Sequence, residues 1–182
     1  MMQEFKYTLT EEDFLYLQLY TASKDENVKK QRKMEKYRLA GFSVICGLVL
    51  LFDDFYQYYA YFLLVGSVLL LFVYPFWSAW YYKRMFKKRI HETYKDRFPS
   101  ESMIGMNDES ISITNQGGHY TFIPSDVNSI VETGKYFYLK LNQFICVIPK
   151  TKVDEKIIQD QLMRYHNIYN VTYITDLDWK WK

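Results

Sequence analysis

Three histidines are the residues of this 182-residue chain best suited to acid–base or metal chemistry. His91 and Glu92 begin the zinc-protease pattern, but position 95 is Lys, so the second histidine ligand is missing. His119 follows a Gly-Gly pair and His166 falls at the expected end of a helix, and neither has a Cys or an acid at ligand spacing. The histidines therefore predict no metal site, and the segment around His91 is interpreted as a polar helix next to a membrane.

The other reactive residue types also have simple interpretations. Gly117-Gly118 lacks the Lys and Ser/Thr of a phosphate-binding loop and predicts a hairpin turn. Cys46 and Cys146 have no partner at zinc-ligand spacing, and two thiols so far apart do not indicate a disulfide framework. The carboxylates of Asp53-Asp54 could hold a cation, but at a hairpin apex they more simply keep a loop hydrated. We expect no catalytic residue, no cofactor and no metal, and a protein that is not an enzyme.

Composition limits the partner classes. The net charge of +2 lacks the concentrated basic face that nucleic acid binding requires, so no nucleic acid partner is expected. Charged residues make up 24% of the chain and aromatic residues 19%, but charge is absent from one block and dense on both sides of it. This distribution indicates a membrane protein. The polar N-terminus shows no secretory signal.

The central uncharged block, residues 55–82, predicts a transmembrane helix. About 20 apolar residues in a helix cross a bilayer core of about 30 Å, and this block is longer. Its ends are aromatic, with Tyr58 and Tyr61 on one side and Trp77 and Trp80 on the other, as at the two membrane interfaces. Pro75 near the end is expected to bend or loosen the helix.

A second span is predicted for residues 39–52, whose uncharged stretch alone is short enough for an interfacial helix. Basic clusters precede this block and follow the central one, whereas only Asp53 and Asp54 carry charge between them. If both blocks span, every basic cluster is cytoplasmic, as the positive-inside rule favours. We therefore expect a multi-pass protein of the inner (cytoplasmic) membrane with both termini cytoplasmic.

Four segments follow from this interpretation. They are an N-terminal strand and basic cytoplasmic helix (1–36), the transmembrane hairpin (37–82, with spans at about 37–53 and 58–80), a basic juxtamembrane linker helix (83–100) and a cytoplasmic β domain with a C-terminal helix and tail (101–182). The residues expected at the membrane interface are Lys29, Lys30, Arg32, Lys33, Lys36, Arg38, Trp77, Trp80, Lys83, Arg84, Lys87, Lys88 and Arg89. Within the first segment, residues 5–9 alternate as a half-buried strand does. Thr10 to Asp13 resembles a capping box, opening a helix from about Glu11 to Lys36 that could run directly into the first span.

The C-terminal third has the short alternating runs of an antiparallel sheet. We expect strands at 111–114, 120–123, 127–131, 136–141 and 144–148, with Asn142-Gln143 as a short hairpin connection. The fifth run is fully apolar and is expected to be buried on both faces. A helix is expected from Thr151 to about Tyr165, with Ile157, Ile158 and Leu162 as its apolar stripe. The fold class is therefore α+β.

The order of these elements resembles that of the YcxB-like family of bacterial membrane proteins. The residues that carry the resemblance are Tyr7-Thr8-Leu9-Thr10-Glu11-Glu12-Asp13-Phe14, Phe122-Ile123-Pro124-Ser125-Asp126-Val127 and Val147-Ile148-Pro149-Lys150, placed around a basic helix and a two-span hairpin. One departure is Phe122, where a Trp would be expected. The resemblance implies a small antiparallel, pleckstrin-homology-like β domain, closed by a C-terminal helix, on a two-helix transmembrane hairpin. It implies no biochemical function.

Two non-enzymatic functions are compatible with this sequence. The leading hypothesis is a module that binds a protein or a lipid at the cytoplasmic membrane surface. The alternative is an accessory subunit of a membrane transporter or exporter, in which Gly41, Gly47, Gly66 and Ser67 would allow close helix packing. The expected partners are membrane lipids and an unidentified membrane or cytoplasmic protein, and homo-oligomers remain open. The alternating Trp and Lys of the tail could dock on headgroups, fill a groove on the domain or stay disordered.

Overall fold

The computed structural model describes residues 3–94, 98–141 and 144–182. Within them the chain has the expected α+β organisation, with four α-helices and eight strands. The helices are α1 (Glu11–Lys24), α2 (Glu26–Leu50), α3 (Gln57–Tyr94) and α4 (Glu155–Tyr169). The strands are β1 (Gln3–Leu9), β2 (Ser100–Met106), β3 (Ile111–Asn115), β4 (Gly118–Phe122), β5 (Val127–Thr133), β6 (Tyr136–Leu141), β7 (Ile145–Pro149) and β8 (Thr172–Asp176).

The chain divides into two compact units. We call Met1–Leu17 with Arg89–Lys180 the β unit, and Gln18–Lys88 with Trp181–Lys182 the helical unit. Helices α1 and α3 each run from one unit into the other.

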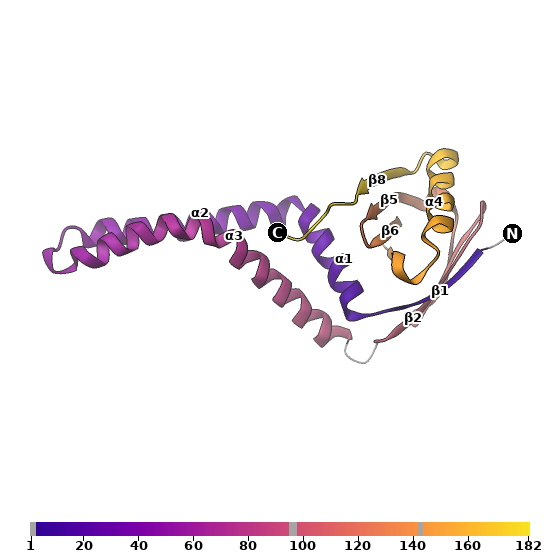
Figure 1. Cartoon of the computed structure of the whole chain (residues 1–182), viewed down its shortest axis with the longest axis horizontal. Coiled ribbons are helices and arrows are strands. Elements are labelled where there is room, and N and C mark those ends of the chain that lie inside the picture. Colours follow the sequence, from indigo (N-terminus) through magenta and orange to yellow (C-terminus); the bar gives the residue numbers. More distant parts are fainter. Residues whose placement is uncertain (1–2, 95–97, 142–143) are drawn as a thin grey trace. The chain divides into compact units, whose positions relative to one another are not determined.

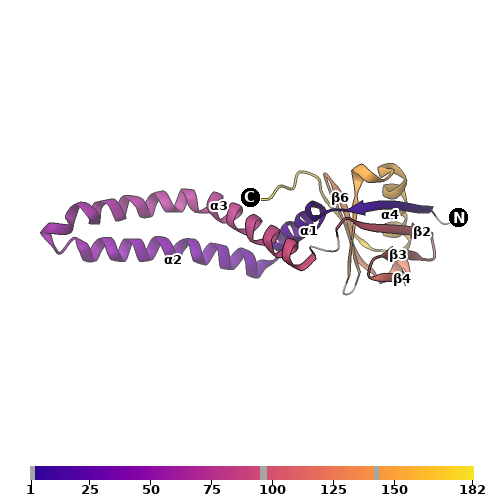
Figure 2. The ribbon, with the colours of Figure 1, turned by 90° about the horizontal axis from the view of Figure 1, so that it is seen from below.

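The β unit contains two four-stranded sheets (Figure 2). The first has the order β1-β2-β3-β4 and is antiparallel throughout. The second has the order β7-β6-β5-β8, in which β8 pairs parallel to β5 and the other pairs are antiparallel. The Tyr7 hydroxyl of the first sheet lies 3.7 Å from the Cys146 sulfur of the second, so the two sheets face each other.

One strand pair joins distant parts of the chain. β1 and β2 pair over seven consecutive residues, from Gln3 opposite Met106 to Leu9 opposite Ser100. The whole helical segment lies in the sequence between these two strands. The chain that leaves the first sheet at Leu9 therefore returns to the same sheet at Ser100.

The core of the β unit lies between the sheets and α4. Ile104 of the first sheet, Phe137 and Ile148 of the second, and Ile158 and Leu162 of α4 have no exposed surface. Burying a side chain of this size is worth about 1.5–3 kcal/mol relative to leaving it in water, so these residues hold the three layers together.

The strands expected from the sequence are confirmed as β1 and β3–β7. Four of the five residues of β7 are buried, as its apolar run predicted. Two strands were not anticipated. Four of the seven residues of β2 are polar or glycine, which obscures the alternation. The parallel partner of β8 is 43 residues away at the start of the pairing, Ser129 opposite Thr172. The predicted Asn142-Gln143 connection lies outside the described residues.

Two helix boundaries differ from expectation. The helix expected from Glu11 to Lys36 is interrupted at Asp25, whose side chain caps α2 by accepting hydrogen bonds from the backbone N–H of Asn27 (2.7 Å) and Val28 (3.3 Å). An Asp that caps a new helix favours an extended backbone, which ends the preceding one. The C-terminal helix begins at Glu155 rather than Thr151, because Asp154 is its cap and residues Lys150–Lys152 form a 3-10 turn.

The capping box at the start of α1 is confirmed. The Asp13 carboxylate accepts from the Thr10 N–H (2.8 Å), and the Thr10 hydroxyl oxygen accepts from the Asp13 N–H (3.4 Å).

In the helical unit, α2 and α3 run antiparallel and side by side (Figures 1 and 2). Gly47 makes this approach possible, because a Cβ there would lie 3.0 Å from Leu64 and 3.3 Å from the Ala60 carbonyl oxygen. The Ser43 hydroxyl donates to the Leu63 carbonyl (3.2 Å) across the same interface. A Cβ at Gly41 or Gly66 would meet open space, so of the glycines in this unit only Gly47 is needed for the α2–α3 contact.

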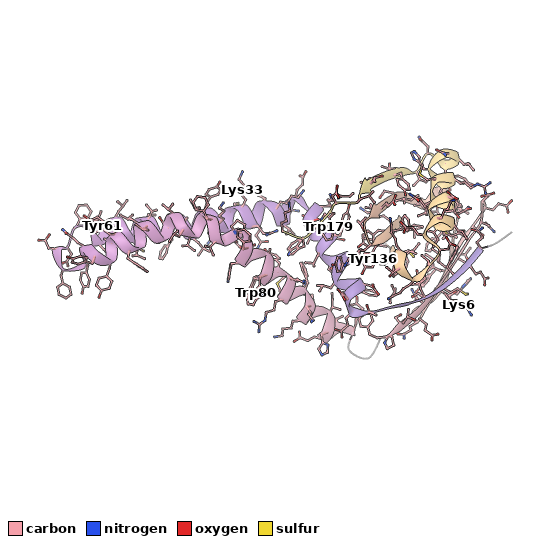
Figure 3. The ribbon with its side chains drawn as sticks, viewed as in Figure 1. Lys6, Lys33, Tyr61, Trp80, Tyr136 and Trp179 are labelled. Carbon is pink, nitrogen blue, oxygen red and sulfur yellow. The ribbon has the colours of Figure 1, made fainter. Side chains whose placement is uncertain are left out.

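Both helices expose large apolar side chains, such as Phe42 (69%) on α2 and Phe72 (70%) on α3. Lys33, Tyr61 and Trp80, which Figure 3 labels, are also exposed. Among the described residues, one helical segment is long and apolar enough to cross a membrane, Asp54–Tyr94, and 17% of its most apolar window is buried. The coarse prediction of an apolar spanning helix is thus supported, and the second span stays a prediction.

Gly47 provides a test of this packing. We expect Gly47→Leu to destabilise the α2–α3 pair by about 1–3 kcal/mol, because the new side chain overlaps Leu64 and the Ala60 backbone. Thermal unfolding of the purified chain in detergent measures this loss. Gly66→Leu is the matched control and is expected to leave the midpoint unchanged. Equal shifts in both variants would contradict the observed interface.

Candidate functional site

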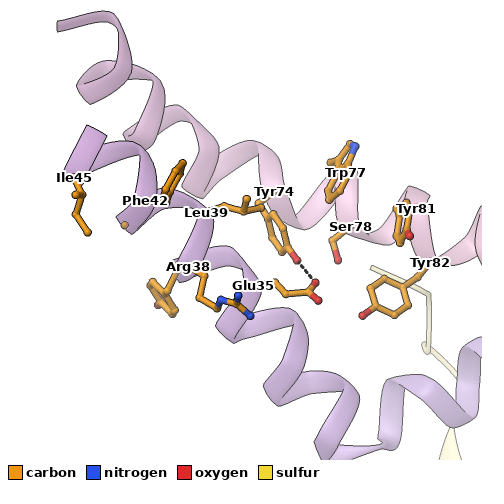
Figure 4. Close-up of a pocket in the computed structure, with 12 residues that line it drawn as sticks. Glu35, Arg38, Leu39, Phe42, Ile45, Tyr74, Trp77, Ser78, Tyr81 and Tyr82 are labelled. Atoms are coloured by element: carbon orange, nitrogen blue, oxygen red, sulfur yellow. Dashed lines mark hydrogen bonds between the residues drawn. The ribbon is translucent and has the colours of Figure 1, made fainter. Parts of the chain in front are cut away.

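A groove of about 830 Å³ lies between α2 and α3 in the helical unit, and we call it the α2–α3 groove (Figure 4). Ligand sites commonly have volumes of about 300–1,000 Å³. The residues that line it are Glu35, Tyr37, Arg38, Leu39, Gly41, Phe42, Ile45, Tyr74, Trp77, Ser78, Tyr81 and Tyr82.

Helical spacing explains this lining. On α2 the groove residues recur at positions 35, 38, 42 and 45, and on α3 at 74, 77, 78 and 81. Residues three and four apart share one face of a helix, so each helix presents a continuous stripe to the groove.

The bend of α3 separates the two stripes. Pro75 lies inside α3, and Figure 1 shows this helix bending partway along its length and diverging from α2. A proline removes one backbone hydrogen bond and its ring clashes with the preceding turn, which commonly kinks a helix. The bend anticipated from Pro75 is therefore present, and the groove lies beside it.

One end of the groove is polar. The Tyr74 hydroxyl donates to Glu35 Oε2 (3.0 Å), and the Gln31 amide donates to Glu35 Oε1 (3.2 Å). Arg38 lies three residues further along α2 and lines the same end (Figure 4). The opposite end, with Leu39, Phe42 and Ile45, is apolar.

Aromatic rings form the α3 wall. Trp77 stacks on Tyr81 with ring centroids 5.4 Å apart and planes 17° apart, and Tyr74 lies 5.9 Å from Trp77. The groove is therefore amphipathic along its length and suits an amphipathic ligand.

Arg32 organises a second cluster in the helical unit. Its Nε donates to the hydroxyl of the buried Ser78 (2.8 Å), and its guanidinium lies 4.9 Å from the Trp181 ring centroid and 5.6 Å from that of Tyr82. Its Nη2 donates to the carbonyl oxygen of Lys182 (3.0 Å), and the Trp181 indole donates to the Ala79 carbonyl (2.8 Å). Trp181 at the end of the tail therefore packs against α2 and α3 of the helical unit. This position differs from the expected groove on the β domain.

Most of the predicted interface residues are on the surface. Arg32 and Lys36 are half-buried, and Arg32 is already engaged by Ser78 and Trp181. Arg84 lies over the Trp80 ring (5.3 Å), and Trp77 lines the groove. The exposed members are Lys29, Lys30, Lys33, Arg38, Trp77, Trp80, Lys83, Arg84, Lys87, Lys88 and Arg89.

In the β unit, Asp13 is a buried carboxylate surrounded by donors. It accepts from the Tyr136 hydroxyl (2.9 Å), from Lys152 Nζ (2.9 Å) and from the Thr10 backbone. Burial alone would raise the pKa of Asp13, but the hydrogen bonds from Lys152, Thr10 and Tyr136 outweigh it and lower that pKa below its usual value. Burial raises the pKa of Tyr136, as does its bond to Asp13, so this hydroxyl acts as a donor and not as an acid.

A second buried cluster joins β5, β8 and α4. Lys150 Nζ lies 2.7 Å from Glu132 and 2.8 Å from Glu155, and the Tyr173 hydroxyl donates to Glu132 (2.6 Å). Burial opposes both charges, yet the hydrogen bonds between them raise the pKa of Lys150 and, with that from Tyr173, lower the pKa of Glu132. Each charge already faces an opposite charge, so this arrangement favours a structural ion pair over acid–base chemistry.

The remaining reactive groups of the β unit lie apart. Burial raises the pKa of the Cys146 thiol to about 12, which disfavours a thiolate nucleophile. His91 pairs with Glu11 (2.9 Å), His119 with Thr114 (2.8 Å) and His166 with the Val171 carbonyl (2.7 Å). Within residues 3–94, 98–141 and 144–182 no group of three or more His, Cys, Asp or Glu could hold a metal ion.

Comparisons with protein-family models, with curated proteins and with solved structures found no match to this chain. The resemblance to the YcxB-like family therefore stays a prediction.

The groove was not anticipated from the sequence. Glu35 is an acid within a basic run, and it shares helical spacing with Arg38 and Phe42. That spacing could have indicated a common face on α2. The partner face on α3 depends on which sides of the two helices meet, and that is a tertiary property.

The Asp13 cluster predicts a pH dependence of stability. Because the pKa of Asp13 is lower in the folded chain than the ordinary 3.8, its ionised form stabilises the fold above pH 3.8, and this contribution is lost as the pH falls through the lowered pKa. We expect Asp13→Asn to reduce the free energy of unfolding by about 2 kcal/mol at pH 7, with the deficit narrowing below pH 4. Denaturant unfolding at several pH values measures it. Asp178→Asn, at an exposed carboxylate, is the control, and a deficit in Asp13→Asn that does not change with pH would contradict the cluster.

Proposed function

We propose that this chain is an integral protein of the cytoplasmic membrane, anchored by α2 and α3 as a two-span hairpin with both termini cytoplasmic. Its β unit acts as a non-enzymatic module that binds a protein or a lipid at the membrane surface.

The observation that carries this proposal is the pairing of β1 with β2. These strands lie before and after the helical segment and share one sheet, so both are in the same compartment. The chain between them must therefore cross a membrane an even number of times. If the apolar segment in α3 crosses, α2 must cross as well.

The dimensions of α2 are compatible with a crossing. The whole helix of 25 residues extends about 37 Å, and its uncharged part, residues 39–50, extends about 18 Å, so a crossing of the hydrocarbon core of about 30 Å also uses residues of the basic part. Phe42, Ile45 and Val49 expose their apolar side chains. Lys36 and Arg38 can extend toward headgroups, which lengthens the usable apolar span.

The charge pattern supports the orientation. The exposed Lys29, Lys30 and Lys33 precede the apolar part of α2, and Lys83 and Lys87 follow that of α3. Asp53 and Asp54 at the turn between the helices carry the opposite charge. The positive-inside rule then places the turn outside and the β unit in the cytoplasm.

The β4 edge of the first sheet supports the binding role. β4 has a neighbour in the sheet on one side, so the other side can accept a strand from a partner. Tyr120 is 41% exposed, and the rings of Tyr120 and Phe122 stack on Phe144 with centroids 6.0 and 6.3 Å apart. Exposed aromatic groups of this kind often anchor interfaces.

We further propose that the β unit is pleckstrin-homology-like, because seven strands precede α4 in the chain. β8 follows this helix and departs from a barrel closed by a C-terminal helix. The fold analogy adds no residue role of its own.

The accessory-subunit function remains the second candidate. It is favoured by Gly41 and Gly66, where a Cβ would meet open space, because small residues on a helix surface admit a neighbouring helix.

Photo-crosslinking in cells distinguishes the two candidates. With a photoreactive residue in place of Tyr120, we expect reproducible protein or lipid adducts, and with one in place of the exposed Lys156 of α4 we expect none. These adducts should persist when α2 and α3 are replaced by an unrelated two-span hairpin. Loss of the adducts after that exchange would favour the accessory subunit, and failure to obtain any adduct at Tyr120 would contradict a binding module.

A further inference from the structure

Glu35 is a carboxylate with two neutral donors. Gln31 and Tyr74 hydrogen-bond its two oxygens, at 3.2 and 3.0 Å. It forms no ion pair with any residue that the structure describes. A half-buried carboxylate is stabilised by a cation, and the groove leaves space for one beside Glu35.

Arg38 supplies a positive charge at the same end of the α2–α3 groove as Glu35. Its guanidinium lines the same end of the groove and forms no hydrogen bond or ion pair within the described part of the chain (Figure 4). Glu35 and Arg38 are one turn apart on α2 but are not within ion-pair distance of each other. The groove therefore presents an anion and a cation side by side, and a zwitterionic ligand can satisfy both.

The apolar part of the groove extends in the direction of the hairpin turn. From Glu35 to Ile45 the helix rises about 15 Å, which is half of a hydrocarbon core of about 30 Å. With the charged pair at headgroup level, Phe42 and Ile45 lie at acyl-chain depth. Trp77 and Tyr81 on α3 are aromatic rings of the kind that favour the interface.

We propose that the α2–α3 groove binds one zwitterionic aminophospholipid of the phosphatidylethanolamine type. Its ammonium lies on Glu35, its phosphate on Arg38, and one acyl chain lies along Leu39, Phe42 and Ile45. The inference rests on the proposed membrane placement and adds the identity of the lipid.

The chemistry of the lipid headgroup determines which phospholipid the α2–α3 groove is expected to prefer. A primary ammonium donates charge-assisted hydrogen bonds to the Glu35 carboxylate, and a trimethylammonium group has no N–H to donate. An anionic headgroup with a glycerol end satisfies Arg38 but brings no cation to Glu35. Phosphatidylethanolamine is therefore expected to bind more tightly than phosphatidylcholine or phosphatidylglycerol.

The test uses the full chain reconstituted with an equimolar mixture of these three lipids, released into mild detergent and analysed by native mass spectrometry. We expect one retained phosphatidylethanolamine per chain. Glu35→Gln keeps the shape of the side chain but removes its charge and should lower that retention about ten-fold, as should Arg38→Gln. Glu26→Gln, an acid-to-amide change on the exposed start of α2 and outside the groove, is the control and should leave retention unchanged.

Gly41→Leu provides an independent variant. A side chain at Gly41 meets open space and so leaves folding intact, but it enters the groove and should displace the lipid. Equal retention of the three lipids, or unchanged retention in both Glu35→Gln and Gly41→Leu, would overturn the assignment. Release of the chain from native membranes by alkaline carbonate would instead overturn the membrane placement itself, so the two failures are distinguishable.

Discussion

Seven residue pairs between β1 and β2 close a long excursion of the chain, and the arrangement of everything else depends on that closure. The pairing of Leu9 with Ser100 places the start and the end of the helical segment next to each other, at the same end of two neighbouring strands. Under the proposed membrane placement, a crossing by α3 alone would separate these strands, so a crossing by α3 implies a crossing by α2 as well. The apolar part of α2 is short, so the proposal of a second span depends on the β1–β2 hydrogen bonds more than on hydropathy.

Two different kinds of interaction support this closure. In the β unit, buried charges with satisfied partners hold elements to the sheets. Asp13 joins the start of α1 to Tyr136 and Lys152, and Glu132 and Lys150 join β5 to the turn before α4. In the helical unit the close approach of the two backbones at Gly47 takes the place of buried charge, a mode of helix packing that is common in membrane proteins. The charges of the α2–α3 groove differ from both, because Glu35 and Arg38 lack a charged partner among the described residues.

Local patterns predicted much of the fold. Short alternating runs identified β1 and β3–β6, a fully apolar run identified β7, and the Thr10–Asp13 box identified the start of α1. The elements that the sequence did not predict depend on distant residues or are obscured by competing local signals. β2 has Ser102 and Gly105 at positions where an alternating strand is harder to recognise, β8 is specified by its parallel partner β5, and the Asp25 cap is hidden within a polar run. The α2–α3 groove requires both the bend of α3 and the contact of two particular helix faces. The position of Trp181 requires that α2 and α3 are already packed together. Neither is encoded in a short window.

The central claim is that α2 and α3 cross the membrane as a pair. Labelling of intact cells with a membrane-impermeant thiol reagent tests it most directly, using Asp54→Cys at the turn between the helices and Lys182→Cys at the C-terminus. The parent chain, with the partly buried Cys46 and the buried Cys146, gives the background. We predict that Asp54→Cys is labelled from outside and that Lys182→Cys is labelled only after the cells are opened. Labelling of Lys182→Cys in intact cells, or protection of Asp54→Cys until they are opened, would contradict the two-span hairpin.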